Sequence, residues 1–377
     1  MNSHKVAIVY DRVNKFGGAE RVLTAIHEIF PDAPLFTSVC ELENASWARI
    51  FPKIYTSFLQ KVAMLKGQHE YLGIFMPSAF ETFDFTNFDL VISVTSESAK
   101  GVITKPGTFH LCICLTPTRY LWSGYEEYLT YPPSKLKAIP FYKYISLPFL
   151  SYVRKWDLVA AQRPDLYVAI SLEVKRRIKK YYNRDSEVIY PPVDVERFAK
   201  TPKKGVGSYY LIVSRLVPYK KVDLAIRAFN ELGLPLWIVG IGSEESRLKR
   251  LAKGNIKFLG FVSDSELPKI YSEAIAFVNP QEEDFGMTVV EAQATGVPVI
   301  AYKKGGVLDT VIDGKTGILF DSQTKESLIK AVGKINNLYH QSNMFKNCRK
   351  NSIKFSKERF KSKFEELVEK VVSSQIE

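Results

Sequence analysis

Two loops in the C-terminal half of the chain carry charged side chains that could do chemistry. The first has Arg215 and Lys220 five residues apart, between an expected strand and an expected helix. A guanidinium is a forked hydrogen-bond donor and an ammonium is a mobile point charge, so together they suit a diphosphate. Most Arg and Lys side chains are solvated surface charges, and this simpler interpretation stays open for the pair by itself.

The second loop, residues 279–292, has the stronger pattern. Successive acids precede a Phe285–Gly286 pair, and seven residues separate Glu283 from Glu291, which lies near the start of an expected helix. Carboxylates accept hydrogen bonds from sugar hydroxyls, and a glycine exposes main-chain amides at the positive end of a helix dipole. We expect Glu283 and Glu291 to face one pocket. Acidic decoration of a helix N-terminus is the alternative, and it would account for only one of the acids.

Two more turns at expected strand ends offer main-chain groups. Gly240 and Gly242 open an expected helix, where the backbone could approach a phosphate or a base. Main-chain groups near Val262, after another expected strand, could bond a nucleobase edge. Ordinary tight turns also use glycine, and the third glycine of the dinucleotide spacing is missing, which counts against a nicotinamide site.

These loops are positioned by apolar runs of strand length that alternate with helical patterns. The runs that predict strands are 5–10, 89–95, 110–115, 166–170, 187–190, 209–214, 236–239, 256–259, 275–279 and 299–302. Helical patterns cover 18–30 and 357–372, and others begin near 221, 243, 264 and 288. This alternation predicts an α/β protein with parallel, Rossmann-like sheets. Such sheets bind ligands at the carboxyl ends of their strands.

Residues 191–208 separate two such alternating regions. This segment holds three prolines, two glycines and several lysines, which predicts a linker. We therefore expect an N-terminal domain at 1–195 and a C-terminal domain at 205–354.

Composition excludes several classes of protein. The 377 residues are 46% hydrophobic, enough for packed cores and too much for a disordered or collagen-like chain. Four scattered cysteines form no disulfide framework, and no metal-ligand spacing accompanies Cys112 and Cys114, so we expect a reducing cytosol and no metal site. We expect neither a signal peptide nor a membrane-spanning helix. The net charge of +12 calls for a partner: nucleic acid, anionic lipid or a phosphorylated ligand.

Several segments together resemble a known family. SRLVPYKKVDLAI, IVGIGSE, IKFLGFVSDSEL and the long stretch EEDFGMTVVEAQATGVPVIAYKKGGVLDTVIDGKTGILF resemble family 4 retaining glycosyltransferases of GT-B fold. VAIVYDRVNKFGGAERVL, SAKGVI, TPTRYLW and SEVIYPPVDVERF in the N-terminal half resemble bacterial mannosyltransferase-like members. The resemblance implies two Rossmann-like domains facing each other across a cleft. It also implies that a C-terminal helix, about 355–377, crosses back to the N-terminal domain.

The resemblance also implies roles for individual residues. Arg215 and Lys220 would neutralise the diphosphate of a sugar nucleotide, while Glu283 would contact its sugar and Glu291 its ribose. The remaining residues implied at the donor are the glycines of the first domain and main-chain groups of the second: Gly17, Gly18, Gly240, Gly242, Val262, Phe285, Gly286 and Met287.

The activity implied is transfer of a hexose with retention of configuration. Mannose from GDP-mannose is the favoured donor, and a glycan or polyprenyl-linked acceptor in surface-polysaccharide or glycolipid synthesis is expected. No Asp-x-Asp motif lies in a suitable strand-end loop, so we expect no metal and no cofactor. A sugar-nucleotide epimerase of the same architecture is the alternative enzyme.

Two histidines common in the family are missing on the acceptor side. Leu115 stands where a histidine often precedes Thr-Pro, and residues 95–98 also lack the expected histidine. Either the donor phosphate serves as base, which we favour, or the protein is a binding-only pseudo-transferase. Glu97 is a candidate substitute and Arg119 a candidate acceptor contact, whereas His110 begins a strand and is interpreted as structural.

The last feature is a basic, aromatic segment without acids between Leu129 and Trp156. Its basic residues are Lys135, Lys137, Lys143, Arg154 and Lys155, and its aromatic residues include Tyr131, Phe141, Tyr142, Tyr144, Phe149 and Tyr152. The composition fits an anionic membrane surface, which predicts a cytoplasmic protein peripheral to the inner face of the cell membrane. Inward packing of the aromatic side chains is the alternative. No nucleic-acid-binding motif accompanies the charge, so nucleic acid is not an expected partner.

Overall fold

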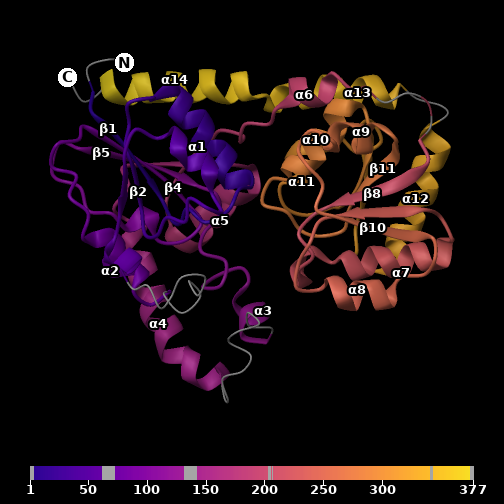
Figure 1. Cartoon of the computed structure of the whole chain (residues 1–377), viewed down its shortest axis with the longest axis horizontal. Helices are drawn as coiled ribbons and strands as arrows, with labels where there is room; N and C mark the ends of the chain where they lie inside the picture. The colour runs from indigo at the N-terminus through magenta and orange to yellow at the C-terminus, as the bar shows by residue number, and fades with distance from the viewer. Residues whose placement is uncertain are drawn as a thin grey trace. The chain divides into compact units, whose positions relative to one another are not determined.

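The computed structural model describes residues 4–61, 73–130, 142–202, 205, 207–339 and 343–373. The chain divides into two compact units, unit 1 with Met1–Tyr190 and Lys361–Glu377, and unit 2 with Pro191–Phe360 (Figure 1). Each unit is an α/β structure around one parallel sheet, as the alternating pattern predicted.

Unit 1 has a seven-stranded sheet in the order β3-β2-β1-β4-β5-β6-β7. Its strands are β1 (Val6–Tyr10), β2 (Leu35–Thr37), β3 (Ile54–Thr56), β4 (Leu90–Thr95), β5 (Phe109–Cys114), β6 (Leu166–Ala169) and β7 (Glu187–Val188). All neighbouring strands pair in parallel. The apolar runs of β1 and β4 are buried along their whole length, as expected of strands covered on both faces.

The helices of unit 1 are α1 (Gly18–Ile29), α2 (Met76–Glu81), α3 (Tyr125–Thr130), α4 (Tyr142–Ala160) and α5 (Leu172–Tyr182). The buried residues of α1 and α5 recur every three or four positions, which is the spacing that lays one helix face on a sheet. Helix α14 (Lys357–Ser373) closes the chain, and its residues from Lys361 onward are grouped with unit 1.

Unit 2 has a six-stranded sheet in the order β10-β9-β8-β11-β12-β13. Its strands are β8 (Tyr209–Val213), β9 (Leu236–Val239), β10 (Ile256–Gly260), β11 (Ala274–Asn279), β12 (Val299–Tyr302) and β13 (Gly317–Phe320). Its helices are α6 (Val195–Ala199), α7 (Val222–Leu232), α8 (Glu245–Leu251), α9 (Leu267–Ser272), α10 (Met287–Thr295), α11 (Val307–Thr310), α12 (Lys325–Tyr339) and α13 (Met344–Ser352). One buried apolar cluster joins the central strands to α7 and α12.

The segment expected to be a linker has structure of its own. It contains α6, where the Asp194 side chain accepts a hydrogen bond from the Arg197 amide as a helix cap. The main chain of Val193 accepts from Lys357 and donates to Phe355, with N···O distances of 3.1 and 3.0 Å. These bonds tie 191–195 to the end of unit 2, whereas the sequence interpretation had placed them in the first domain. The local sequence does not reveal this pairing, because the partners of Val193 lie more than 160 residues further along the chain.

Candidate functional site

The strand order of unit 2 reverses between β8 and β11, so the loops after these strands lie together at the carboxyl end of the sheet. The first loop ends in a 3-10 helix, η7 (Pro218–Lys220), and the second carries Glu283. Lys220 Nζ lies 2.5 Å from Glu283 Oε1, and the two side chains are 13% and 16% exposed. The sheet therefore brings together Lys220 and Glu283, two of the residues expected at the donor, in a position that solvent still reaches.

Glu283 is held by its neighbours on the same loop and on the next one. The Gln281 side chain donates to Glu283 Oε1 at 2.5 Å and also to Asn279. The Gly306 amide donates to the main-chain oxygen of Glu283 at 2.7 Å. At Gly305, which has φ of +81°, a Cβ would lie 2.2 Å from that same oxygen, so only glycine permits the close approach.

The expected glycine turn has a structural reason to be glycine. A Cβ on Gly240 would lie 1.9 Å from the main-chain oxygen of Ser214, and one on Gly242 would lie 2.2 Å from that of Leu216. The loops after β8 and β9 thus pack backbone against backbone, and Leu216 donates to Ile241 at 2.9 Å. This close packing shapes the main chain beside Arg215 whether or not a phosphate binds there.

The other expected donor-side residues have different surroundings. Arg215 is exposed, and its guanidinium donates to the Tyr219 hydroxyl. Glu291 lies in α10, where it is 2% exposed and accepts from the Tyr271 hydroxyl at 3.0 Å. Phe285 is a core residue whose ring centroid lies 5.5 Å from that of Phe355.

The main-chain candidates lie at element ends. Gly286 has φ of +91° and immediately precedes α10, whose first residue is Met287. Val262 follows β10 and is half-buried. In unit 1, Gly17 caps α1 and Gly18 is its first residue. Buried Glu20, in the first turn of α1, accepts from the Tyr10 hydroxyl at 2.6 Å; burial and this carboxylate raise the pKa of Tyr10.

Unit 1 holds a further charged pair, Arg12 and Glu97, of which the sequence analysis names only Glu97 as a candidate. Its strand order reverses between β1 and β4, and Arg12 follows β1 while Glu97 follows β4. Two parallel hydrogen bonds join them, from Nη1 to Oε1 at 3.1 Å and from Nη2 to Oε2 at 2.5 Å. The local signal for Arg12 is a cation two residues after the first strand.

Asp11, next to Arg12, is buried and was not a predicted residue. Its carboxylate accepts from the Thr95 hydroxyl and from the amides of residues 96–99, at 2.8–3.1 Å. Burial and the nearby Glu97 raise the pKa of Asp11, while the hydrogen bonds from Ala99, Ser96 and Thr95 act in the opposite direction.

A second network in unit 1 has a buried ion pair at its centre. Lys100 Nζ lies 2.6 Å from Asp157 Oδ1, with side chains 2% and 1% exposed. Asp157 also accepts from the Thr118 hydroxyl and from the Trp122 indole. The network fixes the turn that contains Arg119, a half-buried residue whose main-chain oxygen accepts from Gly124 at 2.8 Å.

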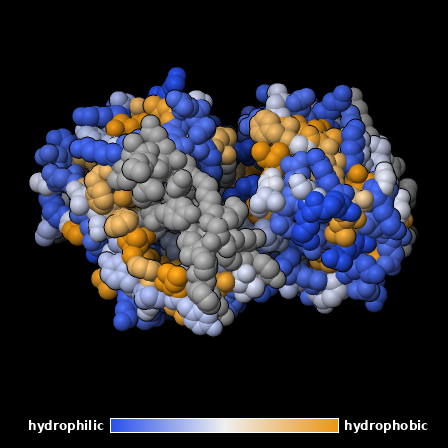
Figure 2. All heavy atoms as spheres, turned by 60° about the horizontal axis from the view of Figure 1, so that its bottom comes forward, coloured by the Kyte–Doolittle hydropathy of each residue, from blue (hydrophilic) through white to orange (hydrophobic). Residues whose placement is uncertain are grey.

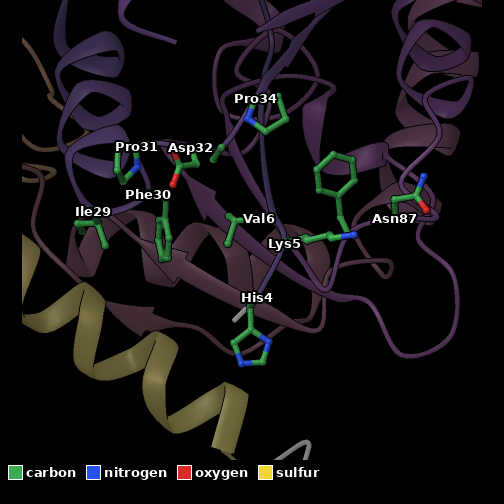
Figure 3. Close-up of a pocket in the computed structure, with 11 residues that line it drawn as sticks. His4, Lys5, Val6, Ile29, Phe30, Pro31, Asp32, Pro34 and Asn87 are labelled. Carbon is green, nitrogen blue, oxygen red and sulfur yellow. The ribbon is translucent and has the colours of Figure 1, made fainter. Parts of the chain in front are cut away.

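The remaining features of unit 1 lie away from these strand ends. His110 is buried against the Ser93 hydroxyl, and burial, followed by Arg163 and Arg184, lowers its pKa to about 3. A pocket of about 670 Å³ lies at the amino ends of the strands, opposite the ends that carry Arg12 and Glu97. It is lined by residues just before β1, β2 and β4 such as His4, Pro34 and Asn87 (Figure 3). It contains none of the expected site residues.

Comparisons with known proteins place this geometry in context. Residues 194–355 match the family described as glycosyl transferases group 1. A GDP-mannose-dependent alpha-(1-6)-phosphatidylinositol monomannoside mannosyltransferase of Mycolicibacterium smegmatis is 35% identical over 175 residues, 39% of this chain and 46% of the relative. A glycogen synthase of Pseudomonas aeruginosa is 34% identical over 155 residues, 38% of this chain and 30% of the relative. The chain thus matches about half or less of the length of these relatives.

Solved structures resemble the chain over nearly its whole length. Anabaena HepE in complex with UDP-glucose has a TM-score of 0.71 at 17% identity, covering 97% of this chain and 100% of that one. Sucrose-phosphate synthase from Thermosynechococcus elongatus has a TM-score of 0.73 at 15% identity, covering 98% of this chain and 100% of that one. At these identities the likeness shows the fold, which is GT-B with its two parallel-sheet units.

Proposed function

Because residues 194–355 match the family of group 1 glycosyl transferases and the chain has the GT-B fold, we propose that the protein transfers a hexose from a sugar nucleotide to an acceptor hydroxyl. The observation that carries the proposal is the Lys220–Glu283 pair at the strand reversal of unit 2. Ligands of parallel sheets bind at this place, and the pair offers an ammonium for the diphosphate and a carboxylate for the hydroxyl groups of the sugar.

The chemistry assigned to the pair follows from the reaction. Cleavage of the bond between C1 and the phosphate leaves negative charge on the β-phosphate and positive character at C1. Lys220 has three N–H donors, so it can bond a phosphate while it still holds Glu283. Glu283 then accepts hydrogen bonds from sugar hydroxyls. Fixed charges of this kind act mainly on the transition state, because they need no rearrangement as charge develops.

Other residues complete the donor site in this proposal. Exposed Arg215 supplies a second cation for the diphosphate, and the amides after Phe285 face the sugar or phosphate at the start of α10. Glu291 holds the ribose, and main-chain groups at Gly17, Gly18, Gly240, Gly242 and Val262 approach the nucleotide. These five positions are proposed on the sequence resemblance.

The finer points of the reaction are also proposals. GDP-mannose is the favoured donor, since the relative that is 35% identical over 175 residues is a mannosyltransferase that depends on it. The UDP-glucose complex of HepE keeps UDP-sugars as the alternative. Retention of configuration, a glycan or lipid-linked acceptor and transfer without metal complete the proposal, with lysine, arginine and a helix N-terminus taking the place of a divalent cation.

A donor screen tests the assignment. Thermal shift and product release are measured over GDP-, UDP- and ADP-sugars, with and without excess chelator. Lys220→Ala and Glu283→Gln are each expected to lower the transfer rate ~10²–10³-fold, the usual loss when one transition-state contact is removed. Lys304→Ala is the matched control, because Lys304 pairs with Glu282 on the same loop at 2.9 Å but is half exposed. It is expected to change the rate little.

The outcomes separate the competing functions. Wild-type rates in both Lys220→Ala and Glu283→Gln contradict the site, and complete loss of activity in chelator contradicts metal independence. Donor binding without sugar transfer or release favours the binding-only alternative. An epimerised nucleotide sugar favours the epimerase.

The proposed membrane association rests on α4. Leu150 and Val153 pack into a buried cluster, whereas Tyr144, Phe149 and Tyr152 on other sides of the same helix are exposed. These three residues contradict a uniformly inward packing of the aromatic side chains. Apolar side chains also come to the surface on the side of unit 1 that Figure 2 turns forward. Lys135 and Lys137 lie outside the described residues, as do Tyr131 and Phe141.

An exposed apolar helix face beside basic residues fits the interface of an anionic membrane, and the chain carries a net charge of +12. None of the helices in the described part of the chain is long and apolar enough to cross a bilayer. Flotation with anionic and with neutral vesicles tests the surface. A Tyr144→Ser/Phe149→Ser/Tyr152→Ser variant is expected to lose binding to anionic vesicles, while Phe261→Ser, which alters an exposed residue of unit 2, keeps it. Equal flotation of both variants contradicts the assignment to α4.

A further inference from the structure

The Arg12–Glu97 pair of unit 1 occupies the same place in its sheet as the Lys220–Glu283 pair does in unit 2. In each unit, a cation follows the first strand, a glutamate follows the strand paired with it, and the strand order reverses between the two. Side chains at such a reversal face the general ligand position of open parallel sheets. Unit 1 therefore has a charged pair at its own ligand position.

The exposure of this pair distinguishes it from the buried ion pair of the same unit. The side chains of Arg12 and Glu97 are 17% and 21% exposed, close to the values for the pair in unit 2. The Lys100–Asp157 pair of the same unit is almost completely buried and serves the core. A ligand can thus reach Arg12 and Glu97 without any rearrangement of the core.

Unused hydrogen-bonding capacity remains at the pair. The guanidinium uses one hydrogen bond from each of two nitrogens to hold Glu97. Arg12 Nε is buried and finds no hydrogen-bond partner among the residues that the structure describes. Each Glu97 oxygen accepts one of these bonds and can accept another.

Asp11 fixes the position of Glu97. The loop that carries Glu97 presents four successive amides and the Thr95 hydroxyl to one buried carboxylate. A loop tied at so many points is preorganised, so a ligand need not order it on binding. The Asp11 carboxylate thus holds Glu97 within hydrogen-bonding distance of Arg12 and close to a ligand bound at the pair.

The local charge selects the class of ligand. Arg12 and Glu97 neutralise each other, and the neighbouring Asp11 adds no positive charge. In unit 2, by contrast, Arg215 adds a second cation to the Lys220–Glu283 pair. The pair in unit 1 therefore has no surplus positive charge for a phosphate. Sugar hydroxyls both donate to carboxylates and accept from guanidinium groups. We propose that the Arg12–Glu97 pair binds hydroxyl groups of an uncharged sugar acceptor, and that Asp11 is a positioning residue for it. The inference rests on the proposed glycosyl transfer, and it narrows the acceptor to neutral glycans.

Binding to a glycan array tests the inference, because the acceptor is unidentified. The full chain, saturated with GDP, is applied to neutral, sialylated, sulfated and phosphorylated glycans. The variants are Glu97→Gln, Arg12→Gln and the double variant Arg12→Gln/Glu97→Gln. Glu81→Gln is the matched control, since Glu81 forms a 2.6 Å pair with Arg163, which lies before β6 at the opposite edge of the sheet.

The expected result is binding of the wild type to neutral glycans. Each single variant should weaken this binding ~10–100-fold, the range for losing a hydrogen bond to a charged group, while Glu81→Gln leaves it unchanged. Where a single variant lowers the melting temperature, the double variant, which leaves no unpaired charge, decides. Asp11→Asn should weaken glycan binding but leave the affinity for the nucleotide unchanged. The nucleotide affinity is measured separately, because a general loss of folding would reduce it as well.

Two results would overturn the inference. One is unchanged binding of neutral glycans by all the Arg12 and Glu97 variants, and the other is a wild type that binds anionic glycans alone or no glycan. Failure of the proposed function is seen differently, as absence of sugar-nucleotide binding by the wild type in the donor screen.

Discussion

The two units place a cation and a glutamate at equivalent positions but hold them by different means. In unit 2, the loops approach through glycines, and a Cβ at Gly240 or Gly305 would collide with a neighbouring main-chain oxygen. In unit 1, a single buried carboxylate, Asp11, gathers the amides of the loop that carries Glu97. Close backbone packing in unit 2 and a buried hydrogen-bond acceptor in unit 1 are thus two ways to fix a loop that carries a charged side chain. Substitutions at the two places should therefore destabilise the protein by different amounts.

The largest expected effect comes from removing the buried acceptor of unit 1. Asp11→Ala leaves the amides of residues 96–99 without their partner, and loss of one partner in a buried charged network costs roughly 3–5 kcal/mol. Urea unfolding gives the loss, and hydrogen exchange resolved by peptide shows where it occurs. Protection is expected to fall around 95–101 in unit 1, with unit 2 unaffected. A loss below about 1 kcal/mol would mean that water or other groups replace the carboxylate.

A smaller effect is expected from filling a close approach in unit 2. Gly240 has φ of +127°, and an added Cβ would lie 1.9 Å from the Ser214 oxygen, so Gly240→Ala should destabilise unit 2 by about 1–3 kcal/mol. It should also weaken nucleotide binding, because the loop after β8 carries Arg215 and Lys220. Gly254→Ala is the matched control, since its Cβ would meet no atom within 4 Å. Equal stability of the two variants would show that the loop relaxes.

This difference explains which parts of the site could be predicted from the sequence. Acids next to a Phe-Gly pair predict that Glu283 lies in a donor loop, and the spacing of Arg215 and Lys220 predicts a second such loop. The structure places the side chains of Lys220 and Glu283 2.5 Å apart. Asp11 contacts residues 84–88 positions away, and no local pattern reveals that. Arg12 likewise lacks a distinctive local pattern, and Glu97 is a candidate from the sequence only because a histidine is missing nearby.

The elements of the fold that could be predicted from the sequence are likewise those with a local pattern. Alternating apolar runs predicted the α/β class and most strands, since strands such as β1 and β4 are buried on both faces and have a continuous apolar sequence. The short strands β2 and β3 gave too few residues for a pattern. Helix α6 was hidden in a segment rich in proline and lysine, because its place depends on main-chain bonds to Phe355 and Lys357.

The smallest expected effect is a loss of stability in acid, which His110 should confer on unit 1 alone. Burial keeps the His110 imidazole of unit 1 neutral, with a pKa of about 3 against an ordinary value of 6.5. Between these values the unfolded chain binds a proton that the folded chain does not, so stability is full above pH 6.5 and falls as the pH is lowered. One such group contributes at most about 1.4 kcal/mol per pH unit.

His110→Gln isolates this contribution, because all other titrating groups are the same in both proteins. Free energies of unfolding from urea titrations at several pH values between 6 and 4 should fall more steeply for the wild type than for His110→Gln, by up to about 1.4 kcal/mol per pH unit. The absolute stability of the variant does not matter, since the slope is compared. Hydrogen exchange should place the acid-sensitive opening in unit 1. Parallel slopes would mean that His110 gains a proton without unfolding, and that unit 1 is no more sensitive to acid through this residue than unit 2.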